Sequence, residues 1–171
     1  MRGGSAYQDT TELETRSDYY ASFGNVSDSL SINGANNGDT TTLGSAFGHL
    51  ETIRLVLSIQ GNEALTTLGS AFGNLTWVGW RAQYGLRIVD NPVLTTLGTA
   101  FNNIQNIHGE LQIQNNPLLT NFEALRGLQC HGSPSGNGTH YYDQRTNCVN
   151  CPDWLKNLPR CEENCFQAGQ C

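Results

Sequence analysis

The amino-acid sequence predicts an α/β solenoid: a right-handed coil with one parallel β-sheet, a mostly irregular opposite side and a small disulfide-bonded C-terminal cap. Two observations lead to this prediction. A motif returns every 25 to 29 residues along the middle of the chain, which is the spacing of stacked solenoid coils. All six cysteines follow residue 129. We therefore expect an N-terminal segment at residues 1–20, the solenoid at 21–128 and the cysteine-rich cap at 129–171.

The turn of each coil has the motif Thr-Thr-Leu-Gly-Ser/Thr-Ala-Phe. Successive copies begin at Thr41, Thr66, Thr95 and, in degenerate form, Thr120. The phenylalanines of the three complete copies are Phe47, Phe72 and Phe101. Equivalent residues of stacked coils lie one above the other. We therefore expect a column of aromatic rings in the core, opposite the sheet.

Each coil also carries the strand signature Leu-x-Ile-x-x-Asn-x-x-Leu. It begins at Leu57, Leu86 and Leu111, and its Leu-x-Ile alternation has the period of a half-buried strand. A first strand is expected at Leu30–Ile32. The asparagines of the signature are Asn62, Asn91 and Asn116. We expect their amides to turn inward and to satisfy backbone groups of neighbouring coils, rather than to bind a ligand.

The separations fall in the leucine-rich-repeat range, and one segment narrows the resemblance further. Ile104-x-x-Ile107-x-Gly109-x-Leu111-x-Ile113-x-x-Asn116-x-x-Leu119 resembles the receptor L-domain variety of leucine-rich repeat, and the resemblance covers residues 21–128. It implies a ligand-binding ectodomain followed by a cysteine-rich region, as in relatives of the insulin and EGF receptors. Similar arrays also occur in microbial surface proteins, so the resemblance alone does not imply a receptor.

Composition excludes several classes of function. The formal net charge is −6 and the few basic residues are scattered, so neither nucleic acid nor an anionic membrane surface is an expected partner. No stretch approaches the roughly 18 apolar residues of a membrane helix, and the first residues lack the apolar region of a signal peptide. We find no catalytic cluster and no cofactor motif. The sequence therefore predicts a protein that is not an enzyme and binds no cofactor.

The cysteines and the glycosylation sequons both indicate an extracellular or cell-surface protein. An even number of cysteines in a short segment predicts three disulfides, with fifteen possible pairings; they are Cys130, Cys148, Cys151, Cys161, Cys165 and Cys171. Zinc bound by Cys148, Cys151, Cys161 and Cys165 is the alternative, although it would leave two cysteines unused, so we expect no metal. N-glycosylation is expected at Asn25, Asn74 and Asn137.

Three surfaces are candidates for partner contact. The second full repeat has four extra residues, and insertions in solenoids often form binding loops; its candidate contacts are Trp77, Trp80, Arg81 and Tyr84. The alternative for the two tryptophans is that they cover the edge of the core. The second candidate is the outer side of the sheet: Ser58, Gln60, Arg87, Val89, Gln112 and Gln114. The third is the column of threonines that begin the turn motifs, which we call the threonine column: Thr41, Thr66, Thr95 and Thr120. It could carry O-linked sugar or order water, or its residues could be ordinary solvated turns.

The chain enters the repeats partway through a unit, near Tyr20–Val26, without a cysteine-bearing cap before it. We therefore expect the edge of the strand at Leu30–Ile32 to be open, and an open edge favours head-to-tail pairing with another copy.

The sequence predicts a secreted, non-enzymatic interaction module that carries N-linked glycans, associates with itself and has a structural role in adhesion, a surface coat or a filament. The alternative is the ligand-recognition ectodomain of a cell-surface receptor.

Overall fold

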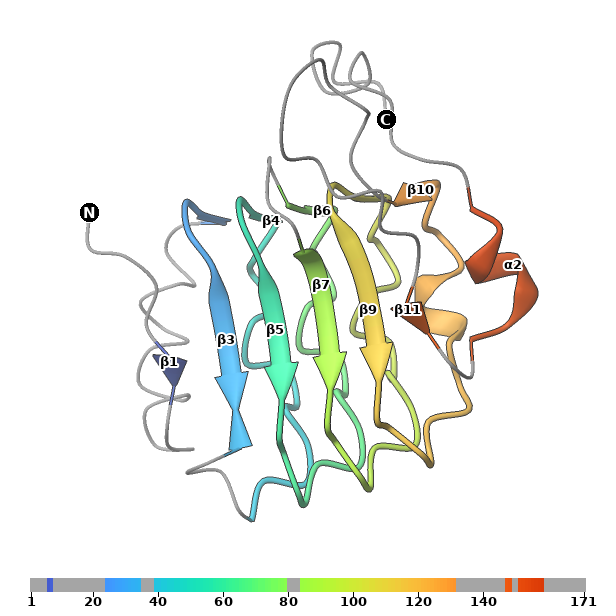
Figure 1. Cartoon of the computed structure of the whole chain (residues 1–171). Helices are drawn as coiled ribbons and strands as arrows, with labels where there is room; N and C mark the ends of the chain where they lie inside the picture. The colour runs from blue at the N-terminus through green and yellow to red at the C-terminus, as the bar shows by residue number, and fades with distance from the viewer. Residues whose placement is uncertain are drawn as a thin grey trace, which may run out of the picture.

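The protein is a β-solenoid with little helix (Figure 1). The computed structural model describes residues 6–7, 24–34, 39–79, 84–131, 147–148 and 151–158. The larger sheet has the strand order β1-β3-β5-β7-β9-β11. Its strands are β1 (Ala6–Tyr7), β3 (Leu30–Asn33), β5 (Leu57–Gln60), β7 (Tyr84–Val89), β9 (Glu110–Gln114) and β11 (Asn147–Cys148).

A second parallel sheet corrects the expectation of one sheet with a mostly irregular opposite side. Its order is β10-β8-β6-β4-β2, and its strands are β2 (Asn25–Val26), β4 (Thr52–Ile53), β6 (Trp77–Val78), β8 (Asn106–Ile107) and β10 (Cys130–His131). A third row of single parallel bridges joins Thr42, Thr67, Thr96 and Asn121. Strands of two residues are too short to show an alternation in sequence, so the pattern of hydrophobic residues could not reveal them.

The larger sheet has the register that the strand signature predicts. Leu30, Leu57, Leu86 and Leu111 form one row across the sheet, and Ile32, Ile59, Ile88 and Ile113 form the next. All eight side chains are buried. The longer second coil returns to the common register through an irregularity between Tyr84 and Leu86. The extra residues therefore do not disturb the stacking of the coils.

The edge of β3 is not open, which corrects the sequence-based expectation. Ala6 pairs with Ser31 and Tyr7 pairs with Ile32, both in parallel register, and Figure 1 shows β1 beside β3. The polar N-terminal segment thus contributes a strand of its own. Its two residues lie outside the repeats, and no sequence pattern distinguishes them from their neighbours.

The predicted aromatic column is confirmed. The rings of Phe47 and Phe72 stack with centroids 5.2 Å apart and an interplanar angle of 4°. Those of Phe72 and Phe101 stack at 5.5 Å and 2°. Stacked pairs of this kind contribute about 0.5–1.5 kcal/mol each beyond the burial of their area. The column therefore aligns three coils on the side opposite the larger sheet.

The predicted asparagine ladder is also confirmed, and all three side chains are buried. Asn62 donates its side-chain amide to Oδ1 of Asn91 at 2.9 Å, and Asn91 donates likewise to Asn116 at 3.0 Å. Asn116 donates to the carbonyl of Ile88 at 2.8 Å. These bonds satisfy polar groups in the interior that would otherwise be unpaired. The asparagines have a structural role and are not free to bind a ligand.

After the repeats, β10 extends the smaller sheet and β11 extends the larger one. Two short helices cover this end: the 3-10 helix η2 (Glu123–Leu125) and α2 (Asp153–Lys156), which buries Leu155. Cys130 and Cys151 are buried and disulfide-bonded, and no cysteine among the described residues is free. Cys161, Cys165 and Cys171 lie outside the described residues, and so does the side chain of Cys148. The framework of three disulfides therefore remains a prediction.

Candidate functional site

The outer side of the larger sheet carries a group of polar side chains, which we call the polar face: Ser58, Gln60, Arg87, Glu110, Gln112 and Gln114. Strand register aligns Ser58 with Arg87 and Arg87 with Gln112. Arg87 Nε donates to Gln112 Oε1 at 2.7 Å, and Gln112 Nε2 donates to Gln114 Oε1 at 3.1 Å. These bonds orient three long side chains, so the polar face is an organised surface.

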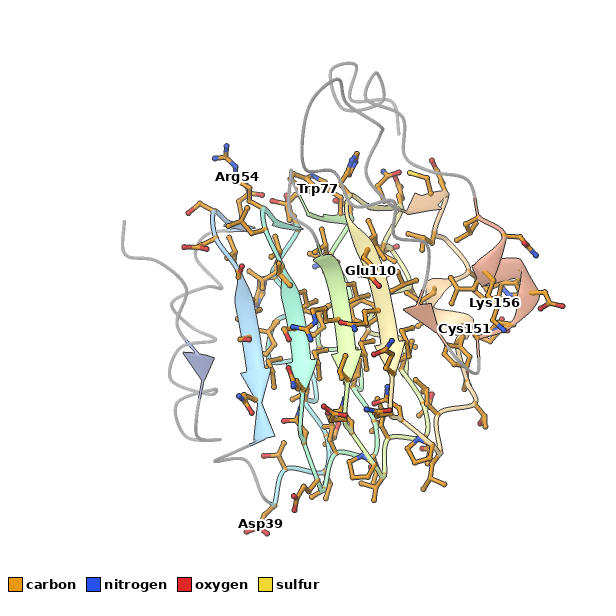
Figure 2. All side chains as sticks on the ribbon, in the orientation of Figure 1. Asp39, Arg54, Trp77, Glu110, Cys151 and Lys156 are labelled. Atoms are coloured by element: carbon orange, nitrogen blue, oxygen red, sulfur yellow. The ribbon has the colours of Figure 1, made fainter. Side chains whose placement is uncertain are left out.

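Glu110 is a residue of this face that our sequence analysis missed. It is only 3% exposed, and its Oε2 is buried without a hydrogen-bond partner. Burial raises the pKa of this carboxyl group, and the charge of Arg87 opposes that rise. Figure 2 shows Glu110 on β9, on the side of the sheet that faces the viewer. The signal was present in the sequence, because Glu110 precedes Gln112 and Gln114 with the period of two that places all three on one side.

Val89 is not exposed on this face as expected, because it is only 6% accessible. The register places it between Gln60 and Gln114, whose longer side chains flank it. Ser58 is likewise buried and lies beside Arg87. Two of the expected outward positions are thus covered, and the accessible part of the polar face consists of arginine and glutamine.

The insert of the second full repeat is described only in part. Trp77 is half-buried in β6, and its ring meets the ring of His108 edge-on, with centroids 6.2 Å apart and an angle of 79°. Burial lowers the pKa of His108. Gly79 follows with φ of 91°, and a Cβ atom there would lie 1.9 Å from the carbonyl oxygen of His108. The start of the insert is therefore packed tightly against the next coil.

The other predicted contacts of the insert lie outside the described residues. Trp80 and Arg81 are among them, and for Tyr84 only the backbone is described, which pairs with Glu110. The structure thus brings the start and the end of the insert next to His108 and Glu110. It does not test the aromatic contact surface itself.

The threonine column uses its hydroxyl groups within the solenoid. Thr66 Oγ1 donates to the carbonyl of Thr41 at 3.0 Å, and Thr95 Oγ1 donates to the carbonyl of Thr66 at 3.1 Å. The side chains remain exposed at the surface. These bonds join successive coils, which favours a structural role for the column over its use as a regular water-ordering surface.

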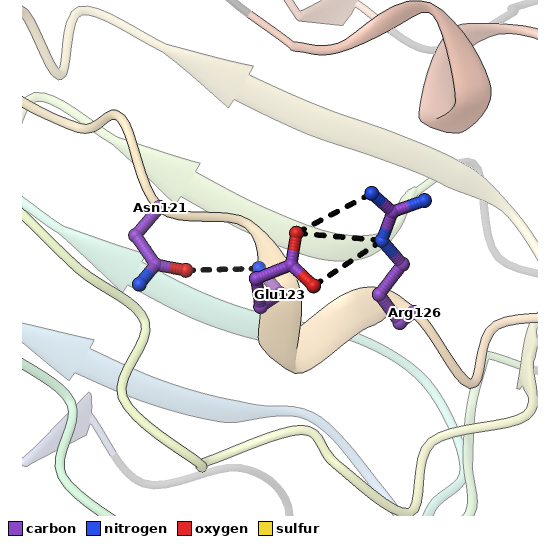
Figure 3. A network of polar contacts seen from close by, with 3 residues as sticks. All are labelled: Asn121, Glu123 and Arg126. Carbon is purple, nitrogen blue, oxygen red and sulfur yellow. Dashed lines mark hydrogen bonds and ion pairs between the residues drawn. The ribbon is translucent and has the colours of Figure 1, made fainter.

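A groove of about 520 Å³ lies at the C-terminal end, between η2 and α2, lined by Thr120, Asn121, Phe122, Glu123, Arg126, Pro152 and Trp154. Figure 3 shows its polar network, in which Asn121 Oδ1 accepts the backbone N–H of Glu123 at 3.0 Å and Arg126 pairs with Glu123 at 3.3 Å. The Arg126 guanidinium also lies 4.1 Å from the centre of the Trp154 ring. Because its charged side chains already interact with each other and with the tryptophan, this groove is a weaker candidate than the polar face.

Two of the three sequon asparagines are described, and both are exposed. Asn25 lies in β2, where its Oδ1 accepts the hydroxyl of Thr52. Asn74 Nδ2 donates to the carbonyl of Gly48 at 2.7 Å. Asn137 lies outside the described residues.

The part of the chain that the structure describes contains no group of three His, Cys, Asp or Glu side chains arranged to hold a metal ion. Within that same part, no helix has the length and apolar character needed to cross a membrane.

Comparison with known proteins places the repeats in one family. The family profile described as "Receptor L domain" matches residues 24–123, which is more than half of the 171 residues. The matched span runs from β2 to the beginning of η2 and contains the whole polar face. A comparison with curated proteins gives no match.

Proposed function

The chain belongs to the receptor L domain family, and from this premise we propose that it recognises a ligand outside the cell, as part of a receptor-type ectodomain, without catalysing a reaction. The family supports this proposal because its members are ligand-binding domains of receptor ectodomains. The extracellular location is further supported by the disulfide bonds of Cys130 and Cys151, which persist in oxidising compartments, and by the exposed sequons.

The polar face is the proposed contact surface. The observation that carries this assignment is the hydrogen-bonded row from Arg87 through Gln112 to Gln114, which rests on a parallel sheet with a continuous core. Side chains that are already oriented lose less entropy when they bind a partner. The row lacks large apolar anchors, so we expect a polar contact in which hydrogen bonds determine specificity.

Glu110 supports the same surface. A buried polar atom without a hydrogen bond costs about 1–3 kcal/mol, and such atoms in native proteins call for an explanation, of which a functional role is one. Oε2 of Glu110 is such an atom. A ligand that reaches this carboxyl group and donates a hydrogen bond to Oε2 would remove the free-energy cost of the unpaired atom. The ligand we propose therefore presents N–H or O–H donors at the Glu110 end of β9.

The structural role has less support. Its expected route, self-assembly at an open edge, depended on an unpaired strand at Leu30–Ile32, and that strand is paired with β1. Sedimentation of the purified protein distinguishes the two functions. A monomer across the micromolar range agrees with ligand recognition, whereas assembly that grows with concentration would favour the structural role.

A binding screen tests the proposal directly. The secreted protein, fused to a dimeric carrier, is screened against an array of secreted and cell-surface ectodomains, and each binder is retested with Arg87→Ala and Gln112→Ala. Arg54→Ala is the matched control, because Arg54 is an exposed arginine outside the polar face. We expect each variant of the polar face to weaken binding by about tenfold, the loss typical of a contact that matters. Binders that tolerate both variants as well as they tolerate Arg54→Ala would contradict the assignment.

A further inference from the structure

A polar groove of about 440 Å³ lies beside the smaller sheet, away from the polar face, lined by Glu51, Asn74, Thr76, Asn102, Asn103, Ile104, Gln105, Gly127 and Gln129. One wall is a column of equivalent residues from successive coils: Glu51, Thr76, Gln105 and Gln129. Their backbones are joined by hydrogen bonds of 2.7 to 2.8 Å. Asn74, Asn103 and Gly127 form a second column along the groove, two residues earlier in each coil. The groove therefore runs along the solenoid axis across several coils.

The lining is rich in amides and hydroxyls, and Glu51 is the only charged side chain among the described residues that form it. Gly127 ends the column that Asn74 and Asn103 begin. A Cβ atom at Gly127 would lie 3.2 Å from the carbonyl oxygen of Asn102 and 3.3 Å from that of Ile104, so even an alanine would crowd these backbone groups. Neutral donors and acceptors along a concave surface fit a neutral ligand rich in hydroxyl and amide groups, which is the chemistry of a saccharide.

The groove also contains an attachment point for such a ligand. Asn74-Leu75-Thr76 is a sequon, and both Asn74 and Thr76 line the groove. Leu75 between them is fully buried, and Thr76 Oγ1 donates to the carbonyl of Glu51 at 3.0 Å. The buried leucine and this bond fix the sequon against the wall of the groove. Any group attached to Asn74 must start there.

We propose that the groove holds the first sugars of an N-linked glycan carried by Asn74. The proposal rests on the extracellular location proposed above. The ligand of this groove would be a glycan attached to the same chain.

In the transfer from a lipid-linked oligosaccharide, the Nδ2–C1 bond forms, the bond from C1 to the pyrophosphate oxygen breaks, and Nδ2 loses one of its two protons. The remaining N–H can keep the 2.7 Å bond to the carbonyl of Gly48, which orients the first sugar.

The neighbouring coil provides an internal comparison. Asn103 occupies the same position one coil further on and donates to the carbonyl of Gly73 at 2.6 Å, as Asn74 does to Gly48. Asn103 is followed by Ile104 and Gln105 and is therefore not a sequon. The groove thus has a single attachment point, and the amides of Gln105 and Gln129 remain available to contact the glycan. Asn25 is an exposed sequon that does not line the groove.

The test uses the whole chain secreted from eukaryotic cells. Site occupancy is measured by mass spectrometry, and the rate at which a glycosidase releases each glycan is measured on the native protein and on the denatured protein. We expect Asn74 to be occupied. We also expect native release at Asn74 to be at least about tenfold slower than at Asn25, a factor that one or two net hydrogen bonds supply, with equal rates after denaturation.

Gln105→Ala and Gln129→Ala shorten exposed side chains that line the groove. They should accelerate native release at Asn74 and leave release at Asn25 unchanged, while Gln60→Ala on the polar face should change neither rate. An unoccupied Asn74 beside an occupied Asn25 would overturn the inference and leave the extracellular assignment standing. If both sites are unoccupied, the extracellular assignment fails too. Equal native release at the two sites, or variants without effect, would show that the glycan does not lie in the groove.

Discussion

Asn91 donates its side-chain amide to Oδ1 of Asn116 at 3.0 Å, and its backbone N–H donates to the same oxygen at 3.1 Å. The amide also donates to the carbonyl of Ile59 at 3.2 Å, in the preceding coil. One buried side chain thus joins three successive coils. Because each coil of a solenoid contacts mainly its neighbours, such a residue transmits stability along the whole array.

Replacing this residue should therefore be severe. We expect Asn91→Leu to lower the free energy of unfolding by about 2–4 kcal/mol, because it leaves several buried polar groups unpaired. Asn103→Leu is the matched control, since Asn103 also bonds to the preceding coil but is exposed; its effect should stay below about 1 kcal/mol. Urea unfolding of both variants measures the difference. Equal losses would mean that burial does not explain the role of the ladder.

The glycines of the turn motif allow conformational strain to be separated from steric contact. Gly44 and Gly98 occupy equivalent positions with φ of 58° and 62°. A Cβ atom at Gly98 would lie 2.3 Å from the carbonyl oxygen of Gly69, whereas at Gly44 nothing lies within 4 Å. Gly44→Ala should therefore cost only the left-handed backbone penalty of about 1–2 kcal/mol.

Gly98→Ala carries the same penalty and also a clash with backbone that cannot move freely. We expect a loss at least about 1–3 kcal/mol greater than that of Gly44→Ala, the range for overpacked sites. Thermal and urea unfolding of the pair provide the comparison. If the two substitutions have the same effect, the close stacking of these turns does not contribute to stability.

The repeats explain how much of the architecture could be predicted. Identical spacing of Leu, Ile and Asn fixes the register of the larger sheet, and the recurrent phenylalanine fixes the opposite wall, so both were predicted from the sequence. The smaller sheet could not be predicted, because two-residue strands such as Thr52–Ile53 have no period. The pairing of Tyr7 with Ile32 was missed because one partner lies outside the repeats.

Only part of the candidate site could be predicted. The alternation of the strands shows which side chains point outward, but it does not show which of them are buried by their neighbours. Arg87, Gln112 and Gln114 follow from the alternation of the strands, and the structure adds the hydrogen bonds between them. Val89 was placed on the correct side of the sheet, but its burial depends on the neighbouring glutamines in space. Glu110 lies one residue before the Leu-x-Ile signature, which begins at Leu111, so a search based on that signature passed over it.

The raised pKa of Glu110 predicts a specific pH dependence. Because the pKa of the folded state lies above the ordinary value of 4.5, the folded protein holds this proton more strongly than the unfolded chain does. The stability that this group contributes is therefore fully present below the unfolded pKa and is lost as pH rises through the folded pKa. Glu110→Gln cannot ionise, so the variant should become more stable relative to the parent as pH rises through this window.

Urea unfolding of both proteins at pH values below and above 4.5 checks this dependence. Gln112→Ala is the control on the same face, because it removes no titratable group and should give a difference that is independent of pH. If Glu110→Gln loses stability relative to the parent as pH rises, the attraction of Arg87 outweighs the effect of burial, and the sign of our argument is wrong.

The final prediction concerns β1, which covers the edge of β3 through the pairs Ala6 with Ser31 and Tyr7 with Ile32. Deleting residues 1–10 removes this strand and leaves backbone donors and acceptors of β3 unpaired. The loss of this pairing should lower the free energy of unfolding by about 1–3 kcal/mol. An uncovered strand edge also favours pairing with another chain, so we expect association that grows with concentration in sedimentation experiments. Deletion of residues 1–4 is the matched control, because it shortens the same segment and leaves β1 in place.

A second substitution identifies the contact. Ser31→Pro removes a backbone donor from β3, so in the protein that lacks residues 1–10 it should suppress association through this edge. Association that persists with the proline would have to come from another surface. A shortened protein that stays monomeric across the micromolar range, with the stability of the control, would show that β1 neither protects β3 nor stabilises the first coil. A monomeric parent beside an associating deletion would mean that the N-terminal strand itself blocks head-to-tail growth, and that the self-assembly expected from the repeats alone is prevented by two residues outside them.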